Sequence, residues 1–283
     1  MDYLNELAPA DEIAYQTIKA NLKKTTGLDL KGYKDNYIKR RMSGRLSSSK
    51  AQNYTEYLMF LNKNPEEYAE LKNFITINVT KFFRDKNTYD FVMNIVLPGI
   101  IAEKEKAPVK KLAIWSAGCS IGEEPYSISI MLHEILGTRI REFSPTIHAT
   151  DVDDEAIRDA KIGEYDKEAF SETDPVLAQK YFALNPATKR YAVKPEIKSI
   201  VDFKHQDMIH ERPLPNMDLI FCRNVLIYFS EETHQLVFRN FHESLRPGGY
   251  LVIGGSESIH GEMAAKFETV NMYAHTFRKP AAK

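Results

Sequence analysis

From Lys110 to the end of the chain, short apolar runs alternate with amphipathic segments, and this alternation constrains the fold more than any other feature. Helical patterns occupy about residues 124–136, 154–161 and 231–245. The runs between them have the length and apolar content of buried strands: Leu112–Ser116, Thr146–Thr150, Asp218–Cys222 and Tyr250–Ile253. Strands that alternate with helices in this way predict β-α-β units. We therefore expect an α/β domain with a mostly parallel sheet over residues 110–283.

Residues 1–77 carry helical patterns instead. Four segments have the periodicity of amphipathic helices: 11–27, 35–46, 54–64 and 65–77. Gly27 follows the first segment as a helix stop, and Pro65 opens the last one in a first-turn position. We expect an all-α domain over residues 1–77, followed by a linker and connecting helix over residues 78–109.

One part of the α/β region interrupts the β-α-β alternation. The segment from about 178 to 204 contains an Asn-Pro turn flanked by Tyr and Val residues, which favours a small antiparallel β-subdomain. The last segment, residues 268–279, alternates apolar and polar residues like a hairpin strand at a sheet edge.

Charge, cysteine content and hydropathy exclude several classes of protein. A formal net charge of -1 gives no general attraction to nucleic acid or acidic lipid. Two cysteines are too few for a disulfide scaffold, and the eight histidines show no metal-ligand spacing. The N-terminus is acidic, and no apolar run approaches the ~20 residues that span a bilayer. We expect a cytoplasmic protein with no metal site, no nucleic-acid partner and no insertion into the membrane.

The turn between the first strand and the following helix reads GCSIG, residues 118–122. Gly118 and Gly122 let bare backbone approach a ligand at the helix N-terminus. The spacing differs from the GxGxxG of dinucleotide-binding proteins, and Glu123 and Glu124 follow directly. This arrangement disfavours a phosphate and favours a cationic cofactor. The alternative is a plain β-α turn whose two acidic residues complement the helix dipole.

Polar residues also follow the next strands. Asp151 ends the second strand, Arg223 and Asn224 follow the third, and Tyr228 lies just beyond. In an open α/β sheet these carboxyl ends form the ligand-binding edge, where an acid accepts hydrogen bonds from ribose hydroxyls. Singly, Asn224 is explained as a turn residue and Tyr228 as a packing residue. Asp153, two positions after Asp151, is better explained as the cap of the next helix. Together the strand ends favour a nucleoside pocket.

Upstream, residues 78–85 offer Asn78, Thr80 and Arg84 beside two phenylalanines. A capping turn explains Asn78 or Thr80 alone. A guanidinium with apolar neighbours usually has a carboxylate partner. A ligand carboxylate is therefore one candidate partner for Arg84.

Four motifs, in this order, resemble the CheR-type chemoreceptor glutamate methyltransferases: NVTKFFRD, WSAGCSIGEEPYS, ATDVDDEAI and FCRNVLIYF. The resemblance covers essentially the whole chain. It implies a class I S-adenosylmethionine-dependent methyltransferase domain, Rossmann-like, with a small antiparallel β-subdomain and a preceding all-α domain. It also implies methyl transfer from S-adenosylmethionine to glutamates of chemotaxis receptors. The products would be glutamate methyl esters, which serve sensory adaptation, and S-adenosylhomocysteine.

The resemblance further implies the residues of the site. Asp151 suits the ribose, and Glu123 suits a positively charged part of the cofactor. Arg84 and Tyr228 are expected to align the substrate carboxylate, which is already ionised at neutral pH and needs no general base. Asp207-Met208 departs from the Asn-Leu that is frequent in the family at an adenine contact. The full set of expected cofactor contacts is Asn78, Thr80, Arg84, Gly118, Glu123, Asp151, Asp207, Met208, Arg223 and Asn224.

A basic patch lies between residues 31 and 50. On a helix, Arg41 and Arg45 share one face. Ile38, Met42 and Leu46 then turn inward. A charge run of this kind is usually a solvated face. With the resemblance, we interpret it as a docking surface for the acidic cytoplasmic helical bundle of a methyl-accepting chemotaxis receptor, formed by Lys39, Arg40, Arg41 and Arg45.

Two other functions stay open from the sequence. A nucleic-acid methyltransferase would share the fold, but N6-adenine enzymes carry Asn/Asp-Pro-Pro-Tyr where Val-Leu-Ile-Tyr follows Asn224 here. A non-catalytic receptor-binding module would keep the pocket for regulation. Some family members also bind a C-terminal receptor pentapeptide through the β-subdomain, and the short NPATK turn favours a pentapeptide-independent enzyme.

Overall fold

The computed structural model describes residues 7–76 and 78–281. The acidic residues 1–6, position 77 at the end of the fourth expected helix, and residues 282–283 lie outside this range. The described chain forms two compact units. Residues 7–76 and 228–233 make up the helical unit, and residues 78–227 and 234–281 make up the α/β unit.

The helical unit contains the four helices that the sequence predicts. They are α1 (Pro9–Thr26), α2 (Asp35–Ser49), α3 (Tyr54–Lys63) and α4 (Glu67–Ile75). Gly27 ends α1 in the left-handed conformation (φ 79°), and the Asn53 side chain accepts a hydrogen bond from the Glu56 N–H at the start of α3. Ile38, Met42 and Leu46 of α2 are buried, as their spacing predicts.

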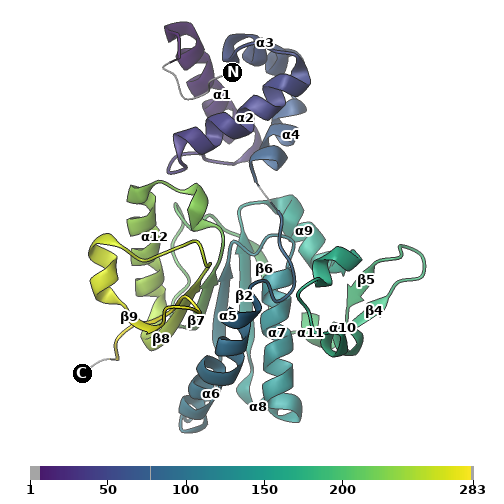
Figure 1. The fold of residues 1–283 in the computed structure, drawn as a ribbon, viewed down its shortest axis with the longest axis vertical. Helices are drawn as coiled ribbons and strands as arrows, with labels where there is room; N and C mark the ends of the chain where they lie inside the picture. Colours follow the sequence, from purple (N-terminus) through teal and green to yellow (C-terminus); the bar gives the residue numbers. More distant parts are fainter. Residues whose placement is uncertain (1–6, 77, 282–283) are drawn as a thin grey trace. The chain divides into compact units, whose positions relative to one another are not determined.

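A seven-stranded sheet forms the centre of the α/β unit (Figure 1). Its order is β6-β2-β1-β7-β8-β10-β9, which is 3-2-1-4-5-7-6 when these strands are numbered along the chain. The first five run parallel, and β10 is antiparallel to both neighbours. This confirms the expected mostly parallel sheet with a terminal hairpin. The strands are β1 (Ala113–Ala117), β2 (Thr146–Asp151), β6 (Val201–His205), β7 (Met217–Cys222), β8 (Leu245–Ile253), β9 (Glu268–Asn271) and β10 (Thr276–Arg278).

Helices connect the strands and cover the sheet. Helices α7 and α9 both pack against β2. A π-helical turn, Val92–Val96, joins α5 to α6 without a break. Of the helices within the described ranges, none combines the length and apolar content needed to cross a membrane. The helices of this unit are α5 (Lys86–Phe91), α6 (Leu97–Glu105), α7 (Glu123–Leu136), α8 (Ile140–Phe143), α9 (Asp154–Ile162), α10 (Pro175–Tyr181), α11 (Pro195–Lys198) and α12 (Glu231–Ser244), of which α12 belongs to this unit from residue 234 onward.

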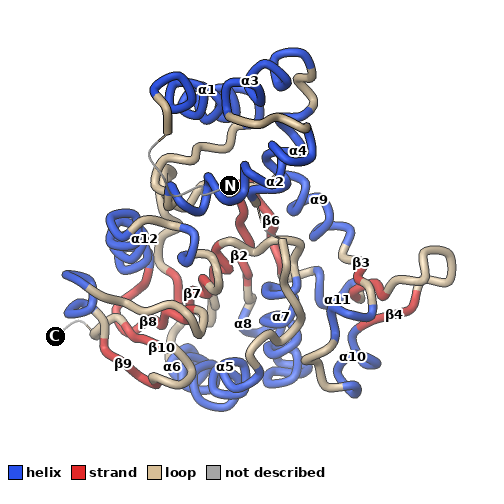
Figure 2. Tube along the Cα trace, turned by 45° about the horizontal axis from the view of Figure 1, so that its top comes forward, coloured by secondary structure: helices blue, strands red, loops and turns tan. Residues whose placement is uncertain are grey.

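A second, antiparallel sheet has the order β3-β5-β4, from β3 (Glu164–Tyr165), β5 (Tyr191–Val193) and β4 (Phe182–Leu184). The loop between β4 and β5 extends away from it (Figure 2). The expectation that residues up to about 204 belong to this insertion is wrong at its end. Residues 201–205 form β6, which pairs parallel with β2 at the edge of the main sheet. The exposed or half-exposed Asp202, Lys204 and His205 on this edge strand gave it the polar alternation of an antiparallel strand.

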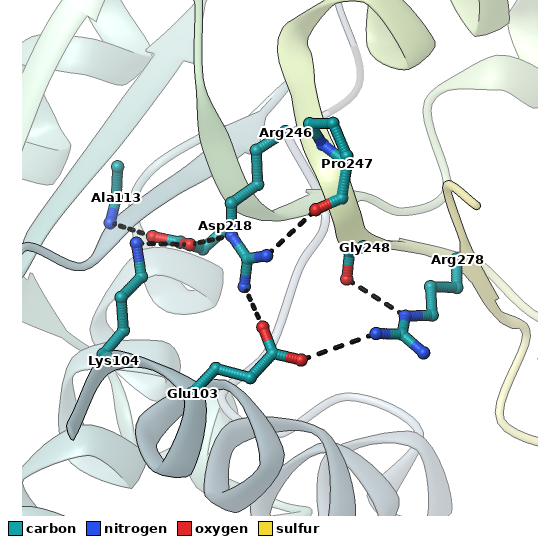
Figure 3. A network of polar contacts seen from close by, with 8 residues as sticks. All are labelled: Glu103, Lys104, Ala113, Asp218, Arg246, Pro247, Gly248 and Arg278. Carbon is teal, nitrogen blue, oxygen red and sulfur yellow. Dashed lines mark hydrogen bonds and ion pairs between the residues drawn. The ribbon is translucent and has the colours of Figure 1, made fainter. Parts of the chain in front are cut away.

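A buried ion network fixes the N-terminal end of β7 (Figure 3). The Asp218 carboxylate is fully buried and accepts from the Ala113 N–H (2.9 Å) and Lys104 Nζ (2.7 Å), and it pairs with Arg246. Arg246 also contacts Glu103 of α6 at 2.7 Å. The network joins α6 to β1, β7 and β8 at the sheet end opposite the carboxyl tips.

Candidate functional site

The strand order reverses between β1 and β7, because the chain continues from β1 to β2 on one side and from β7 to β8 on the other. Ligands of open α/β sheets bind at the carboxyl ends of the strands at such a switch point. The segments that follow β1, β2, β6 and β7 carry most of the expected site residues.

The β1–α7 turn is shaped by residues with positive φ. Gly118, Ser120 and Gly122 have φ values of 77°, 50° and 104°. The Gly118 N–H donates to the Thr150 carbonyl at 2.8 Å, which ties the turn to β2. A Cβ at Gly118 would lie 2.6 Å from Val225 Cγ2, so a side chain there would collide with the segment after β7. The turn therefore requires glycine at this position.

Asp151 is the centre of a polar cluster at the end of β2. Its carboxylate accepts from the Ser120 N–H at 2.8 Å and from the Asp153 N–H at 3.0 Å. Asn78 bridges the cluster, since its amide accepts from Ser120 Oγ and donates to Asp153 Oδ2, both at 3.0 Å. Burial raises the pKa of Asp151, and the two backbone donors oppose that shift. Asp153 also caps α9 through the Glu155 N–H, as predicted from its position.

Glu123 and Glu124 are both buried at the start of α7. Glu124 accepts from Ser116 Oγ at 2.7 Å, and burial raises its pKa to about 7. Glu123 is 2% exposed, and its Oε2 has no hydrogen-bond partner within the described part of the chain. Burial raises the pKa of Glu123 to about 8. A buried, unpartnered carboxylate is unfavourable in isolation and is suited to receive a cation.

Arg223 holds the segment that precedes α5. Its guanidinium donates to the Arg84 carbonyl (2.9 Å) and to the Asp85 carboxylate (2.5 Å), and it lies over the Tyr89 ring. Phe83 and Asp85 on either side of Arg84 have φ values of 54° and 61°. Backbone in this region costs energy in non-glycine residues and persists where surrounding contacts enforce it. Arg223 therefore supports the backbone around Arg84, whose own Nη1 donates to the Val79 carbonyl at 3.2 Å.

Asn224 follows directly and also has a positive φ, 61°. Its side-chain Oδ1 is buried and accepts no hydrogen bond from any described residue. Gly254 packs against it, because a Cβ there would lie 2.8 Å from the Asn224 nitrogen and 3.0 Å from its Nδ2. Like Glu123 Oε2, the Asn224 amide oxygen is thus a buried polar atom that lacks a partner among the described residues.

Comparison with known proteins identifies the family. The model of the "CheR methyltransferase, SAM binding domain" matches residues 78–275, and that of the "CheR methyltransferase, all-alpha domain" matches residues 13–76. The chain belongs to the CheR methyltransferase family. It is 35% identical over 252 residues to a chemotaxis protein methyltransferase of Listeria innocua, which covers 89% of this chain and 92% of that protein. The corresponding protein of Borreliella burgdorferi is 36% identical over 240 residues, covering 83% and 84%. Chemotaxis protein methyltransferase 1 of Pseudomonas aeruginosa is 32% identical over 252 residues, covering 87% and 90%.

The site fits the S-adenosylmethionine that this CheR domain binds. The unpartnered Glu123 carboxylate suits a cationic group, and the Asp151 carboxylate offers acceptors at the end of β2, where it also binds the β1–α7 turn through the Ser120 N–H. Glycine at position 118 lets the segment after β7 pack against the β1–α7 turn, because a Cβ there would lie 2.6 Å from Val225 Cγ2. The buried Asn224 Oδ1 is an acceptor that a ligand N–H or O–H can satisfy. These atoms need complementary polar groups of the kind that the nucleoside and amino-acid parts of this cofactor carry.

The other expected cofactor contacts of this CheR domain vary in their surroundings. Met208 is buried, and its Cε would lie 3.4 Å from a Cβ at Gly118, which puts it at the glycine turn. The Asp207 carboxylate instead accepts from the Ile209 N–H at 2.8 Å and contacts His210 Nδ1 at 2.7 Å. Asp207 therefore stabilises its own turn. Thr80 is half-buried in the segment that leads to Arg84.

Tyr228 belongs to the helical unit. Its carbonyl accepts from the Lys34 N–H at 2.9 Å, and its ring centroid lies 4.8 Å from that of Tyr37 in α2. Phe229 pairs with Tyr33 as an antiparallel bridge, and the two rings meet edge to face. The residues just before and within α2 therefore fix the conformation of the segment that carries Tyr228.

The four residues of the expected docking surface have different partners. Arg45 pairs with the Glu67 carboxylate at 2.8 and 2.6 Å, and Tyr57 Oη donates to the same group. Arg41 donates to the carbonyl of Phe74 at the end of α4. Lys39 pairs with Asp35 one turn away at 2.8 Å, whereas Arg40 is exposed beside the Tyr37 ring. Arg41 and Arg45 thus join α2 to α4, and Arg40 is the most accessible of the four.

Sequence reasoning missed Ser120, Asp153 and Glu257 as parts of the site. Ser120 was visible as a member of the glycine turn, and Asp153 was explained by helix capping alone. Glu257 lies in an ordinary polar loop after β8 and gave no signal, because its contacts are with residues up to 31 positions away.

Proposed function

We propose that this CheR-family chain methylates glutamate side chains on the cytoplasmic helical bundle of chemotaxis receptors. Family membership supports the reaction, and the observation that supports the cofactor site most directly is the buried Glu123 carboxylate with its unpartnered oxygen. We place the activity in the cytoplasm, where such a bundle lies. A nucleic-acid substrate is disfavoured by the net charge of -1.

The reaction asks little acid–base chemistry of the protein. A glutamate with a pKa near ~4.3 is ionised at neutral pH and is already the nucleophile. S-adenosylmethionine, when bound, supplies a methyl group activated by its sulfonium. The protein has to hold the cofactor, orient the substrate carboxylate and exclude water, and orientation alone supplies on the order of 7–11 kcal/mol in the best cases.

In this proposal each residue has a defined task. Glu123 compensates positive charge, Asp151 accepts from the ribose, and Asn224 Oδ1 accepts from a further donor. Arg84 and Tyr228 orient the substrate carboxylate by donating hydrogen bonds to it. Arg223 acts on Arg84 through the backbone, and this support is consistent with a guanidinium whose position is defined before substrate arrives.

The docking surface is assigned mainly to Arg40, with Lys39 beside it. Arg41 and Arg45 contribute positive charge, but their guanidinium groups have structural partners in α4. An acidic receptor bundle would be attracted over a distance set by the Debye length, about 10 Å at 0.1 M salt.

The test incubates the protein and S-adenosylmethionine with a radiolabelled methyl group together with a purified receptor cytoplasmic fragment, duplex DNA or RNA. A reaction without substrate serves as the blank. We expect label on the receptor fragment only, released by mild base as expected for an ester. A matched fragment with alanine at its candidate glutamates should remain unlabelled. Base-stable label, or label on nucleic acid, would contradict the proposal.

A further inference from the structure

Glu257 binds the backbone of the segment that follows β7. It lies in the loop after β8 and is 6% exposed. Its Oε1 accepts from the Leu226 N–H at 2.8 Å, and its Oε2 accepts from the Gly254 N–H at 2.6 Å. Burial raises the pKa of Glu257, and the N–H groups of Gly254, Asn224, Leu226 and Val225 oppose that shift. The carboxylate is thus surrounded by main-chain donors of residues 224–226 and 254.

No Lys or Arg within the described ranges forms an ion pair with Glu257, so backbone dipoles compensate its charge. Successive N–H groups that converge on one anion form a rigid nest when at least one residue is left-handed. Asn224 supplies that residue with φ 61°. A buried carboxylate that accepts several backbone hydrogen bonds resists displacement, because leaving those donors unpaired costs free energy.

This nest determines how the Asn224 side chain lies. Gly254 approaches the Asn224 amide so closely that a Cβ would lie 3.0 Å from Nδ2. The Glu257 carboxylate holds Gly254 and Leu226 on both sides of the same segment. With its backbone and its Nδ2 side confined, Asn224 keeps Oδ1 buried and without a donor from residues 7–76 or 78–281.

We propose that Glu257 is a positioning residue for cofactor binding: it holds the segment 224–226 so that the Asn224 amide oxygen is presented to an N–H or O–H donor of S-adenosylmethionine. This inference depends on the proposed contact between Asn224 and the cofactor. Glu257 itself contacts backbone and acts through Asn224.

The test is calorimetric titration with S-adenosylhomocysteine of the full chain and four variants. E257Q keeps the size of the side chain but turns an NH2 group toward a backbone N–H, and we expect roughly tenfold weaker binding. N224A should weaken binding to a similar extent. The double variant N224A/E257Q should bind no more weakly than N224A, because Glu257 has nothing left to position.

The control is D218N, which disturbs another buried carboxylate of the same unit. Asp218 lies near the opposite end of β7, roughly 13 Å from the strand's carboxyl end at about 3.3 Å per residue. D218N should lower the melting temperature and leave S-adenosylhomocysteine affinity unchanged. Equal losses of affinity in D218N and E257Q would overturn the inference, since both would then report general destabilisation.

Other outcomes separate this inference from the proposed function. If N224A binds as the wild type does, the contact between Asn224 and the cofactor is wrong, and Glu257 has no target. If N224A binds weakly and the effect of E257Q adds fully to it, Asn224 stands and the positioning role of Glu257 is refuted. Should E257Q fail to fold, G254A decides, because its Cβ would lie 2.8 Å from the Asn224 nitrogen and 2.9 Å from Glu257 Oε2 and would push the two apart without removing the carboxylate. Wild-type affinity in G254A would contradict the inference.

Discussion

The raised pKa of Glu123 leads us to predict that cofactor binding releases a proton. The pKa of this buried carboxyl is about 8 in the ligand-free protein. A cation placed beside it favours the ionised form and returns the pKa toward its ordinary range. If the cofactor binds the ionised form, affinity follows the ionised fraction, which is about 1% at pH 6 and roughly a quarter at pH 7.5. Affinity should therefore rise about 25-fold over this interval.

The assay is calorimetry with S-adenosylmethionine, without receptor, in buffers of different ionisation enthalpy between pH 6 and 7.5. This window stays below the α-amino pKa of about 7.7–8.0, so most of the ligand keeps its charge. We expect release of nearly one proton per ligand at pH 6.5 in the wild type and none in E123Q, whose affinity should be flat with pH. If the wild type binds with an affinity that does not change with pH and releases no proton, Glu123 does not face a cation.

Four further predictions concern stability, docking and catalysis. Between pH 4.5 and 8 the folded state keeps the Glu123 proton, whereas the unfolded chain loses it at the ordinary carboxyl pKa near 4.5. The unfolding free energy of the ligand-free wild type should therefore fall over this range by up to about 1.4 kcal/mol per pH unit relative to E123Q, and an equal pH dependence in the two proteins would refute this. E67A removes the bidentate partner of Arg45 from a largely buried pair and should lower the free energy of unfolding by roughly 3 kcal/mol, measured by denaturant titration with circular dichroism. A loss under ~1 kcal/mol would mean that the pair is dispensable. R40E should raise the KM for receptor several-fold at low salt, and the difference from wild type should disappear at high salt while the melting temperature stays the same. An effect that does not depend on salt would point to misfolding. Tyr228→Phe should lower kcat for receptor methylation with unchanged S-adenosylhomocysteine affinity, and a wild-type rate would remove its hydroxyl from catalysis.

Features set by local sequence were predictable. The strand ends with Asp151, Arg223 and Asn224 could be placed at one edge because parallel strands share direction, and the helix cap at Asp153 followed from its position. The inward face of α2 followed from helical periodicity alone. The cap and the helix face depend on residues within a few positions of one another, and the shared edge depends only on the common direction of the strands.

Contacts between distant segments were not predictable. Arg223 donates to Asp85, which is 138 positions away, so its role at the backbone of Arg84 has no signal in its own motif. Arg45 has its partner Glu67 22 positions on, and a basic helix with an internal ion pair has the same sequence pattern as a solvated one. The edge strand β6 has polar residues that resemble those of a surface hairpin, and pairing with β2 decides its place.

A crystal structure of the chain with S-adenosylhomocysteine tests the central claim most directly. The account predicts ligand density at the carboxyl ends of β1, β2 and β7, with the ribose hydroxyls on Asp151, the amino group within hydrogen-bond distance of Glu123 and a ligand donor on Asn224 Oδ1. Density elsewhere on the chain, or a ligand at these strand ends that leaves both Glu123 and Asn224 unpartnered, would contradict it.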